Sequence, residues 1–249
     1  MALISVHFSS KLLQTQTVVR LIMPDRPINK PLQTIWWLHG LGDDGSAWIR
    51  KTRLELFASQ FNVAIIIPDM QRSFFQNIRG GLPYFDYLSK ELPNYLETIF
   101  PLSKNQKDTF LVGNSMGGYG SYKWSALNPD KFSYVATLSP VTNLNTVTSF
   151  MEDYQSILGK EPNKITSLFD LMSPNIEQLK KINWIQFMGS DDSLREDSET
   201  FTKKVQNQLN LDLNQNILSG NHNWTFWDEQ LPELFKWLPL HKLDSGGNN

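Results

Sequence analysis

Short apolar runs recur along the chain, and stretches with helix-like spacing lie between them. A run of about 4–8 residues that is apolar almost throughout is typical of a strand buried on both faces of a parallel sheet. On this pattern we expect strands at 34–38, 62–67, 108–112, 132–139, 182–188 and 213–218. Helices are expected at about 46–60, 84–100 and 118–127, with a kink or break at Pro93. Strands alternating with helices predict an α/β protein whose mostly parallel central sheet carries helices on both faces.

The chain departs from this rhythm at its beginning and in one internal segment. Residues 2–9 and 15–23 are strand-like and joined by a short link, which predicts an antiparallel pair at one edge of the sheet. Residues 140–181 hold helical fragments and no clear strand, so we expect a helical cap insertion over the carboxyl edge of the sheet. The predicted organisation is a single domain over 1–241, followed by a flexible tail at 242–249.

Composition excludes several classes of protein. Of the 249 residues, 40% are hydrophobic and 19% charged, as is usual for a soluble globular chain. The net charge of −2 and the lack of a basic block argue against a nucleic-acid partner. No apolar stretch approaches the roughly 18 residues that span a bilayer, so no membrane association is expected. The N-terminus lacks a basic leader, which makes a cytoplasmic location the expectation. The absence of cysteine excludes disulfides, thiolate metal sites and a cysteine nucleophile.

The most informative pattern is Gly-Asn-Ser-Met-Gly at residues 113–117, between a predicted strand and a predicted helix. G-x-S-x-G at such a junction is typical of the nucleophile elbow, in which a strained turn lifts the serine above the sheet. The turn leaves little space around the serine, so the flanking positions must be glycine or very small. We therefore predict Ser115 as a nucleophile, against the alternative of a glycine-rich turn with an incidental serine.

A serine hydroxyl needs a base, and the chain has only four histidines. His7 lies in the first strand and His241 near the tail, so neither is a good candidate. His39 precedes a glycine loop and remains a second choice. His222 directly follows the last predicted strand, where an open α/β sheet places its sites. We predict His222 as the base.

A carboxylate must orient the histidine. In α/β-hydrolases, whose serine lies on a nucleophile elbow, the chain order is serine, acid, histidine. Asp191 and Asp192 both follow the strand ending at Met188, and position alone does not choose between them. Asp170 and Asp197 are poorer candidates because neither directly follows a strand.

The reaction also needs donors for the oxyanion, and backbone N–H groups serve without reorganisation. We predict one donor at Met116, the residue after the nucleophile. The other is predicted at Leu41, in the loop after an early strand, where Gly40 and Gly42 let the backbone turn inward. His39 is then structural and bonds the loop's own backbone.

Two other features have ordinary explanations. Asp43 and Asp44 are adjacent carboxylates without a nearby histidine, so a solvated loop is favoured over a metal site, and no cofactor or metal is implied. Several aromatic residues could line an acyl or aryl pocket, although most are expected in the core: Trp48, Tyr84, Phe85, Trp224 and Trp227.

Taken together, these stretches resemble the esterase D-like, or putative esterase, family of α/β-hydrolases. The nearest resemblance is to bacterial tributyrin esterases and S-formylglutathione hydrolases. The motifs that carry it are Leu38-His39-Gly40 with Trp48 downstream, Glu91-Leu92-Pro93, residues 113–118, residues 189–192, and residues 220–224 with 226–228. In this family the catalytic aspartate precedes a short Leu- or Phe-containing turn, which Asp192 matches better than Asp191. The resemblance thus implies the α/β-hydrolase fold and a triad of Ser115, Asp192 and His222.

The implied function is a serine carboxylesterase that cleaves short-chain acyl or small aryl esters through an acyl-serine. Its partner is a small-molecule ester, with a homo-oligomer possible. The alternatives are S-formylglutathione hydrolase or another thioesterase, an acyltransferase, and a non-catalytic ligand-binding protein of the same fold. The chain departs from the family in its acidic loop, and it lacks the cysteine that glutathione-type members often carry near the site. Because Asp43, Asp44 and Asp191 would lie near the mouth, an anionic thioester is disfavoured.

Overall fold

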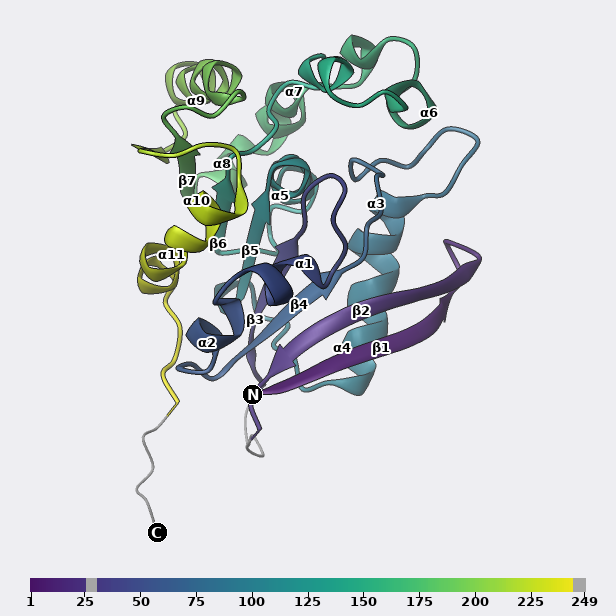
Figure 1. Ribbon diagram of the computed structural model, residues 1–249, viewed down its shortest axis with the longest axis vertical. Helices are drawn as coiled ribbons and strands as arrows, with labels where there is room; N and C mark the ends of the chain where they lie inside the picture. Colours follow the sequence, from purple (N-terminus) through teal and green to yellow (C-terminus); the bar gives the residue numbers. More distant parts are fainter. Residues whose placement is uncertain (26–30, 244–249) are drawn as a thin grey trace.

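The computed structural model describes residues 1–25 and 31–243. A single eight-stranded sheet runs through the molecule in the order β1-β2-β4-β3-β5-β6-β7-β8 (Figure 1). The strands are β1 (Ala2–Ser10), β2 (Thr15–Met23), β3 (Gln33–Leu38), β4 (Val63–Pro68), β5 (Thr109–Asn114), β6 (Tyr134–Leu138), β7 (Asn183–Gly189) and β8 (Leu213–Leu218). Every predicted strand is present, with ends that differ by only one or two residues.

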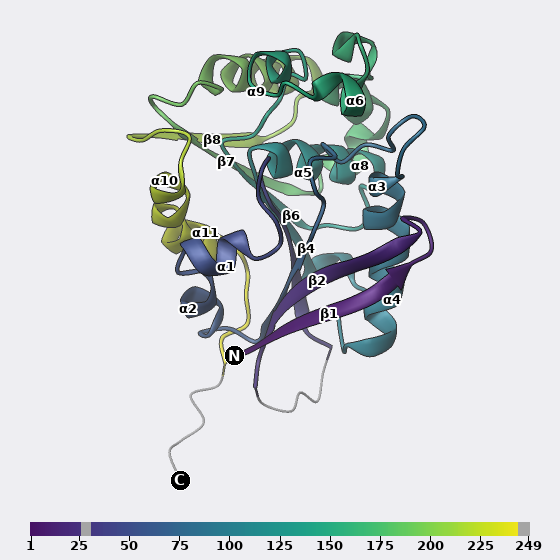
Figure 2. The same ribbon diagram turned by 45° about the vertical axis from the view of Figure 1, so that its right-hand side comes forward.

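The sheet has the predicted mixture of directions. Strand β1 pairs antiparallel with β2, and β2 pairs antiparallel with β4. All other neighbouring strands are parallel. Strands β5, β6 and β7 are adjacent, so the loops that follow them meet at one edge of the sheet (Figure 2). This confirms the α/β fold with an antiparallel N-terminal pair.

Helices cover both faces of the sheet. They are α1 (Ala47–Lys51), α2 (Leu54–Ala58), α3 (Tyr84–Asp86), α4 (Leu92–Ile99), α5 (Met116–Leu127), α6 (Tyr154–Leu158), α7 (Leu168–Met172), α8 (Ile176–Leu179), α9 (Arg195–Leu209), α10 (Trp224–Glu229) and α11 (Leu231–Trp237). Helices α1, α2, α10 and α11 lie on one face, and α4, α5 and α9 on the other (Figures 1 and 2).

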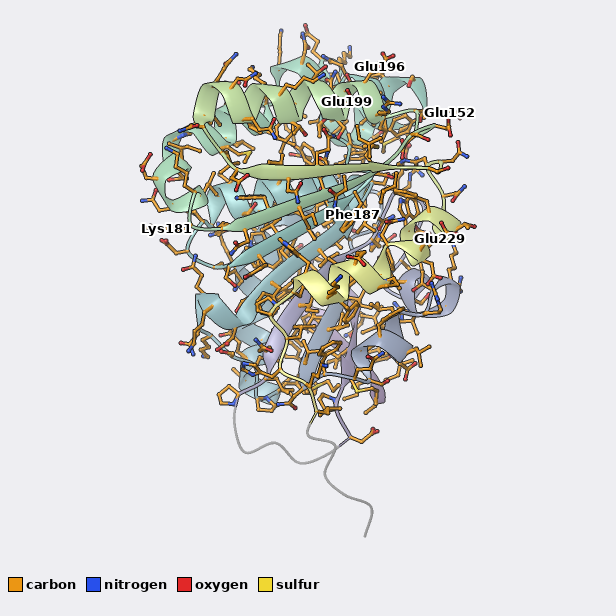
Figure 3. The ribbon with its side chains drawn as sticks, turned by 90° about the vertical axis from the view of Figure 1, so that its left-hand side faces the viewer. Glu152, Lys181, Phe187, Glu196, Glu199 and Glu229 are labelled. Atoms are coloured by element: carbon orange, nitrogen blue, oxygen red, sulfur yellow. The ribbon has the colours of Figure 1, made fainter. Side chains whose placement is uncertain are left out.

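Each face has its own apolar core, because successive side chains of a strand point to opposite sides. In β5, Leu111 packs into the core under α4 and α5, whereas Phe110 and Val112 pack into the core under α2 and α11. Phe187 of β7, labelled in Figure 3, belongs to this second core. The apolar runs of the sequence therefore serve both faces at once.

Two predicted helices are interrupted. The helix expected at 46–60 breaks at Thr52, which is extended (φ −138°, ψ 174°), and Arg53 then donates its backbone N–H to Asp228. The helix expected at 84–100 contains a π-helical turn at Tyr87–Glu91, directly before Pro93 in the first turn of α4. Proline has no N–H to donate to the preceding turn of a helix, so the regular helix is interrupted there. The irregular turn therefore lies next to Pro93, where a kink or break was expected.

The structure describes all of residues 140–181 and shows short helices there, with no strand. These are α6, α7, α8 and the 3-10 turns Thr146–Ser149, Pro162–Lys164 and Ser173–Asn175. Helix α7 packs against α5 and α9, so part of this segment covers the helical layer beside the carboxyl edge (Figure 1). The predicted tail lies outside the described residues from 244 onward. Among the described residues, no helix has the length and apolar character needed to cross a membrane.

Candidate active site

Ser115 occupies a strained turn between β5 and α5. Its φ of 52° and ψ of −115° lie in a region that residues other than glycine seldom adopt. The Ser115 N–H donates to the Leu138 carbonyl at 2.9 Å, and the Ser115 carbonyl accepts from the Val141 N–H at 3.1 Å. These bonds to the β6 side of the sheet fix the turn and hold the hydroxyl above the carboxyl ends of the strands.

The glycines on either side of Ser115 are required by close packing. A Cβ at Gly113 would lie 2.2 Å from the Gly117 carbonyl oxygen, and a Cβ at Gly117 would lie 2.2 Å from the Leu38 carbonyl oxygen. Backbone atoms at that distance cannot move aside cheaply. The steric reason inferred from the sequence therefore holds in the structure.

We expect Gly117→Ala to destabilise the protein by about 3 kcal/mol or more, because the new methyl group would push β3 away from α5. Urea unfolding would measure the loss. Gly159→Ala is the matched control: Gly159 has φ +81°, but a methyl group added there would have no other atom within 4 Å. Backbone strain alone should cost about 1–2 kcal/mol there. Equal losses in the two variants would show that close packing is not what requires Gly117.

Three polar side chains from separate loops form a continuous chain of contacts. His222 Nε2 lies 3.0 Å from Ser115 Oγ. His222 Nδ1 lies 2.9 Å from Asp192 Oδ2 and 3.1 Å from Asp192 Oδ1. Asp191, in contrast, is exposed and accepts only from the neighbouring Ser190 hydroxyl at 3.0 Å. The structure thus brings together the serine, the histidine and the second of the two aspartates.

Asp192 is a buried carboxylate, only 5% exposed. Burial by itself would raise its pKa, but bonding to His222, the His222 charge, the Ser139 hydroxyl and the Leu194 N–H together hold the pKa below the usual value. The Leu194 N–H donates to Oδ1 at 2.9 Å. Asp192 is therefore an ionised acceptor for His222 at neutral pH.

Trp227 supports the same cluster from α10. Its ring lies edge-on to the His222 ring, with centroids 5.1 Å apart, and its Nε1–H donates to the Ser139 hydroxyl at 3.1 Å. Trp48 and Trp224 extend this aromatic stack at centroid distances of 5.2 and 5.0 Å. These tryptophans pack behind the histidine, and none of them lines the cavity beside Ser115.

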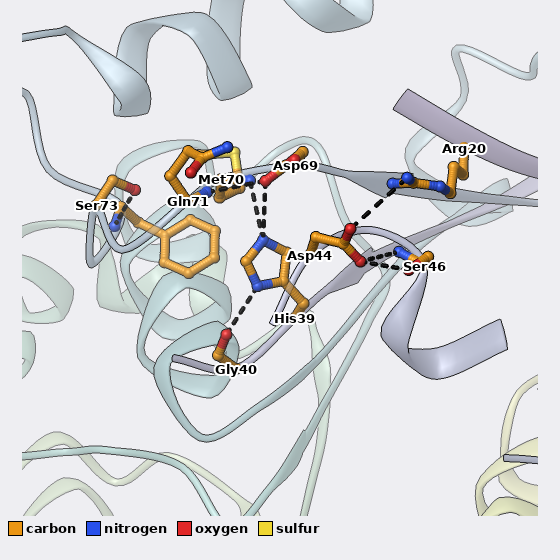
Figure 4. A network of polar contacts seen from close by, with 10 residues as sticks. Arg20, His39, Gly40, Asp44, Ser46, Asp69, Met70, Gln71 and Ser73 are labelled. Atoms are coloured by element: carbon orange, nitrogen blue, oxygen red, sulfur yellow. Dashed lines mark hydrogen bonds and ion pairs between the residues drawn. The ribbon is translucent and has the colours of Figure 1, made fainter. Parts of the chain in front are cut away.

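His39 is fully buried and uses both ring nitrogens (Figure 4). Nδ1 lies 2.8 Å from the Gly40 carbonyl oxygen, and Nε2 accepts from the Met70 N–H at 2.9 Å. Burial lowers the pKa of His39, although bonding to Gly40 and the charge of Asp69 oppose this. With both nitrogens engaged, His39 cannot take a proton from Ser115, and the choice of His39 as base is ruled out on geometry.

A cavity of about 300 Å³ opens beside Ser115 and His222. Leu41, Leu194 and Phe150 supply its apolar lining. Leu41, predicted from the sequence as an oxyanion donor, therefore borders the same space as the serine. Phe150 is 46% exposed and was missed in the sequence, because it lies in the segment 140–181, which has no readable periodicity.

Met116, the other predicted donor, begins α5. The first N–H groups of a helix have no partner within the helix, and they carry the positive end of its dipole. The Met116 N–H is therefore available next to the Ser115 hydroxyl. Leu41 and Met116 thus both lie beside Ser115, and their roles as oxyanion donors stay predictions.

The acidic loop is neutralised by cations that the sequence pattern did not pair with it. Lys51 lies 3.1 Å from Asp43. Arg20 of β2 lies 3.7 Å from Asp44, as Figure 4 shows. Asp44 also accepts from Ser46, which holds its pKa low against the opposing effect of burial. Asp43 and Asp44 therefore each have a cation nearby, which weakens the negative charge of this loop.

Glu91 of the Glu91-Leu92-Pro93 motif has a structural role. Its carboxylate accepts from the Ser10 hydroxyl at 2.6 Å and from the Lys11 and Leu12 N–H groups at 2.6 and 3.1 Å. It therefore fixes the turn between β1 and β2.

Within residues 1–25 and 31–243, no group of three or more histidine, cysteine, aspartate or glutamate side chains could hold a metal ion.

The model of one protein family matches residues 10–238, nearly the whole chain, and this family is described as putative esterase. The chain belongs to the putative esterase family. An acetyl esterase of Caldicellulosiruptor saccharolyticus is 24% identical over 265 aligned residues, which span 96% of this chain and 98% of the relative.

Two solved structures from Staphylococcus aureus are similarly close, each 27% identical and covering 95% of this esterase and 98% of its own chain. One is FphF, a fluorophosphonate-binding serine hydrolase with substrate bound, at a TM-score of 0.87. The other is the S-formylglutathione hydrolase FrmB, at 0.86. The protein is a carboxylic ester hydrolase with an α/β-hydrolase-like fold, as its family and neighbours establish.

Proposed function

We propose that the protein is a serine carboxylesterase acting on short-chain acyl or small aryl esters. The observation that carries this proposal is the unbroken chain of contacts from Ser115 Oγ through His222 to Asp192, at 3.0 and 2.9 Å. Spacings of about 2.6–3.2 Å let a base accept the serine proton and let a carboxylate fix the base. The acetyl esterase relative supports a short acyl group.

In the first half-reaction, Ser115 Oγ forms a bond to the ester carbonyl carbon while its proton passes to His222 Nε2. The carbonyl oxygen becomes an oxyanion, which the N–H groups of Leu41 and Met116 stabilise. The intermediate then collapses: the ester C–O bond breaks, and the leaving alcohol takes the proton from His222. An acyl-serine remains.

In the second half-reaction, water attacks the acyl-serine and gives a proton to His222. Collapse of this intermediate releases the carboxylic acid and returns the proton to Ser115 Oγ. Asp192 stays ionised throughout and stabilises the imidazolium in both halves, which suits its buried position and low pKa.

The cavity limits the size of the ester. Ligand pockets are commonly about 300–1,000 Å³, so a space of about 300 Å³ lies at the small end. Leu41, Leu194 and Phe150 offer it apolar contacts. A short acyl chain or a small ring fits such a space, whereas a long chain would extend into solvent and gain little from binding.

We expect kcat/KM for p-nitrophenyl esters to be highest from acetate to butyrate and at least about tenfold lower for octanoate. A rate series over acyl length measures this directly. Rates that rise steadily to octanoate would contradict the proposed size limit, and no cleavage of any ester would contradict the esterase itself.

S-formylglutathione is a second candidate substrate. Two observations favour it: the likeness to FrmB at 27% identity, and the pairing of Asp43 with Lys51 and of Asp44 with Arg20. With these charges neutralised, repulsion of an anionic thioester is much weaker than the sequence suggested. Turnover of S-formylglutathione measured beside that of p-nitrophenyl acetate decides between the two classes.

A further inference from the structure

The peptide unit between Gly40 and Leu41 joins a fixed carbonyl to a predicted oxyanion donor. The Gly40 carbonyl oxygen accepts from His39 Nδ1 at 2.8 Å and from the Asp43 N–H at 3.3 Å. In a trans peptide the C=O and the following N–H point in opposite directions within one rigid plane. Holding the Gly40 carbonyl toward His39 therefore aims the Leu41 N–H the other way.

The bonding partners fix the tautomer of His39. The Met70 N–H can only donate, so Nε2 must be the acceptor of the neutral ring. Nδ1 then carries the proton and donates it to Gly40. Figure 4 also draws Asp69 near Nε2, but its Oδ1 lies 3.8 Å away, beyond hydrogen-bond distance. Met70 follows β4, and His39 follows β3, so the imidazole ties the loop to the neighbouring strand of the rigid sheet.

The loop that carries this peptide unit also lies close to Ser115. A methyl group at Gly40 would lie 3.5 Å from Ser115 Cβ and 2.9 Å from Asn114 Nδ2, which shows how closely the loop approaches the elbow. Leu41 itself borders the cavity that contains Ser115 and His222. The loop thus contacts His39 through the Gly40 carbonyl and borders the space beside Ser115 through Leu41.

We propose that His39 is a positioning residue for the oxyanion: by donating from Nδ1 to the Gly40 carbonyl, it orients the Leu41 N–H toward the developing negative charge. This inference rests on the serine esterase mechanism proposed above. It gives a reason for a fully buried histidine that takes no part in proton transfer.

Two conservative variants separate the two bonds of the ring. In His39→Asn the side-chain amide nitrogen occupies the place of Nδ1, so the bond to Gly40 is kept and the bond to Met70 is lost. In His39→Gln the amide oxygen reaches the place of Nε2, so the bond to Met70 is kept and the bond to Gly40 is lost. Each variant lacks one hydrogen bond, which makes them matched controls for general destabilisation.

We expect kcat to fall by about 10- to 100-fold in His39→Gln and by less than about threefold in His39→Asn, because a misaimed donor is nearly a lost one. KM should change by less than about threefold in both, since the oxyanion exists only after attack. Inhibition by a trifluoromethyl ketone, which forms an oxyanion adduct, should weaken in His39→Gln by the same factor as kcat.

Equal losses of kcat in the two variants, or losses that follow their thermal midpoints, would show that His39 only stabilises the fold. The wild-type protein supplies an independent check, because the ¹⁵N resonances of His39 must report a proton on Nδ1. A proton on Nε2 would overturn the proposal even if neither variant folds. Failure of the esterase mechanism itself is distinguishable, since turnover would then survive Ser115→Ala.

Discussion

Ser115→Ala should reduce kcat for p-nitrophenyl acetate by about 10⁵- to 10⁶-fold, because no other group can form the acyl intermediate. The fold should survive, because the substitution removes the contact of the Ser115 hydroxyl with His222 but leaves the backbone hydrogen bonds that hold the turn. Initial rates, together with urea unfolding of both proteins, measure the two effects. A fluorophosphonate should label the wild-type protein at Ser115 and fail to label the variant.

Ser125→Ala is the matched control for this prediction. Ser125 is buried in helix α5, which follows Ser115, but its hydroxyl donates only to the backbone carbonyls of Ser121 and Tyr122. The variant should keep its rate within about twofold and should still be labelled. Label found on another serine, or turnover by Ser115→Ala within tenfold of wild type, would refute the proposed nucleophile.

A further comparison uses the strain in the turn. Alanine keeps the unfavourable φ of 52°, whereas glycine adopts it freely. Ser115→Gly should therefore be as inactive as Ser115→Ala yet more stable by about 1 kcal/mol. Such a gain in stability on loss of the nucleophile would show that the strain is retained for activity.

Local patterns account for most of what the sequence could predict. Buried strands are mostly apolar, because both faces of the sheet are covered, and so β3 to β7 can be recognised from a few adjacent residues. The elbow is also local: Gly113, Ser115 and Gly117 meet their steric requirement within five residues. The fold and the candidate nucleophile are therefore predictable without any knowledge of long-range contacts.

The local pattern could not choose between Asp191 and Asp192 as the candidate acid, because the choice depends on how the loop after β7 packs against the loop that carries His222. The Asp191 side chain is exposed, whereas the Asp192 side chain is buried and lies 2.9 Å from His222 Nδ1. His222 lies 30 residues further along the chain, so this contact is not visible in the local pattern. The same reasoning applies to the charges of the mouth, where Arg20 reaches Asp44 from a strand distant in sequence.

The residues that line the cavity could not be predicted from the sequence either. Its exposed aromatic residue, Phe150, directly follows the 3-10 turn Thr146–Ser149, in a segment without periodicity. Trp224 and Trp227, in contrast, lie behind His222. Trp48, for instance, is wholly buried and donates to Asn114. Residue type alone does not separate an aromatic ring that lines a pocket from one that supports it.

Asp192→Asn should lower kcat by about 10⁴-fold, a loss second only to that of the nucleophile. An amide can offer its NH₂ group to His222 Nδ1, which would move the ring proton to Nε2 and leave no acceptor for the Ser115 proton. Asp191→Asn is the matched control, and because Asp191 is exposed and bonds only Ser190, its kcat should stay within about threefold of wild type. Steady-state rates of the two variants test this pair, and the reverse order would assign the acid to Asp191.

The pH dependence of stability gives the same prediction a second measurement. The pKa of Asp192 is lower in the folded protein than its ordinary value of 3.8, so its ionised form stabilises the fold above that value. The contribution is lost as the pH falls through the lowered pKa, where the folded state must also take up the proton. Urea unfolding at neutral pH should therefore find Asp192→Asn less stable than Asp191→Asn, and the difference should shrink in acid. A difference that is the same at both pH values would mean that the carboxylate charge of Asp192 does not stabilise the site, and its role in holding His222 would have to be given up.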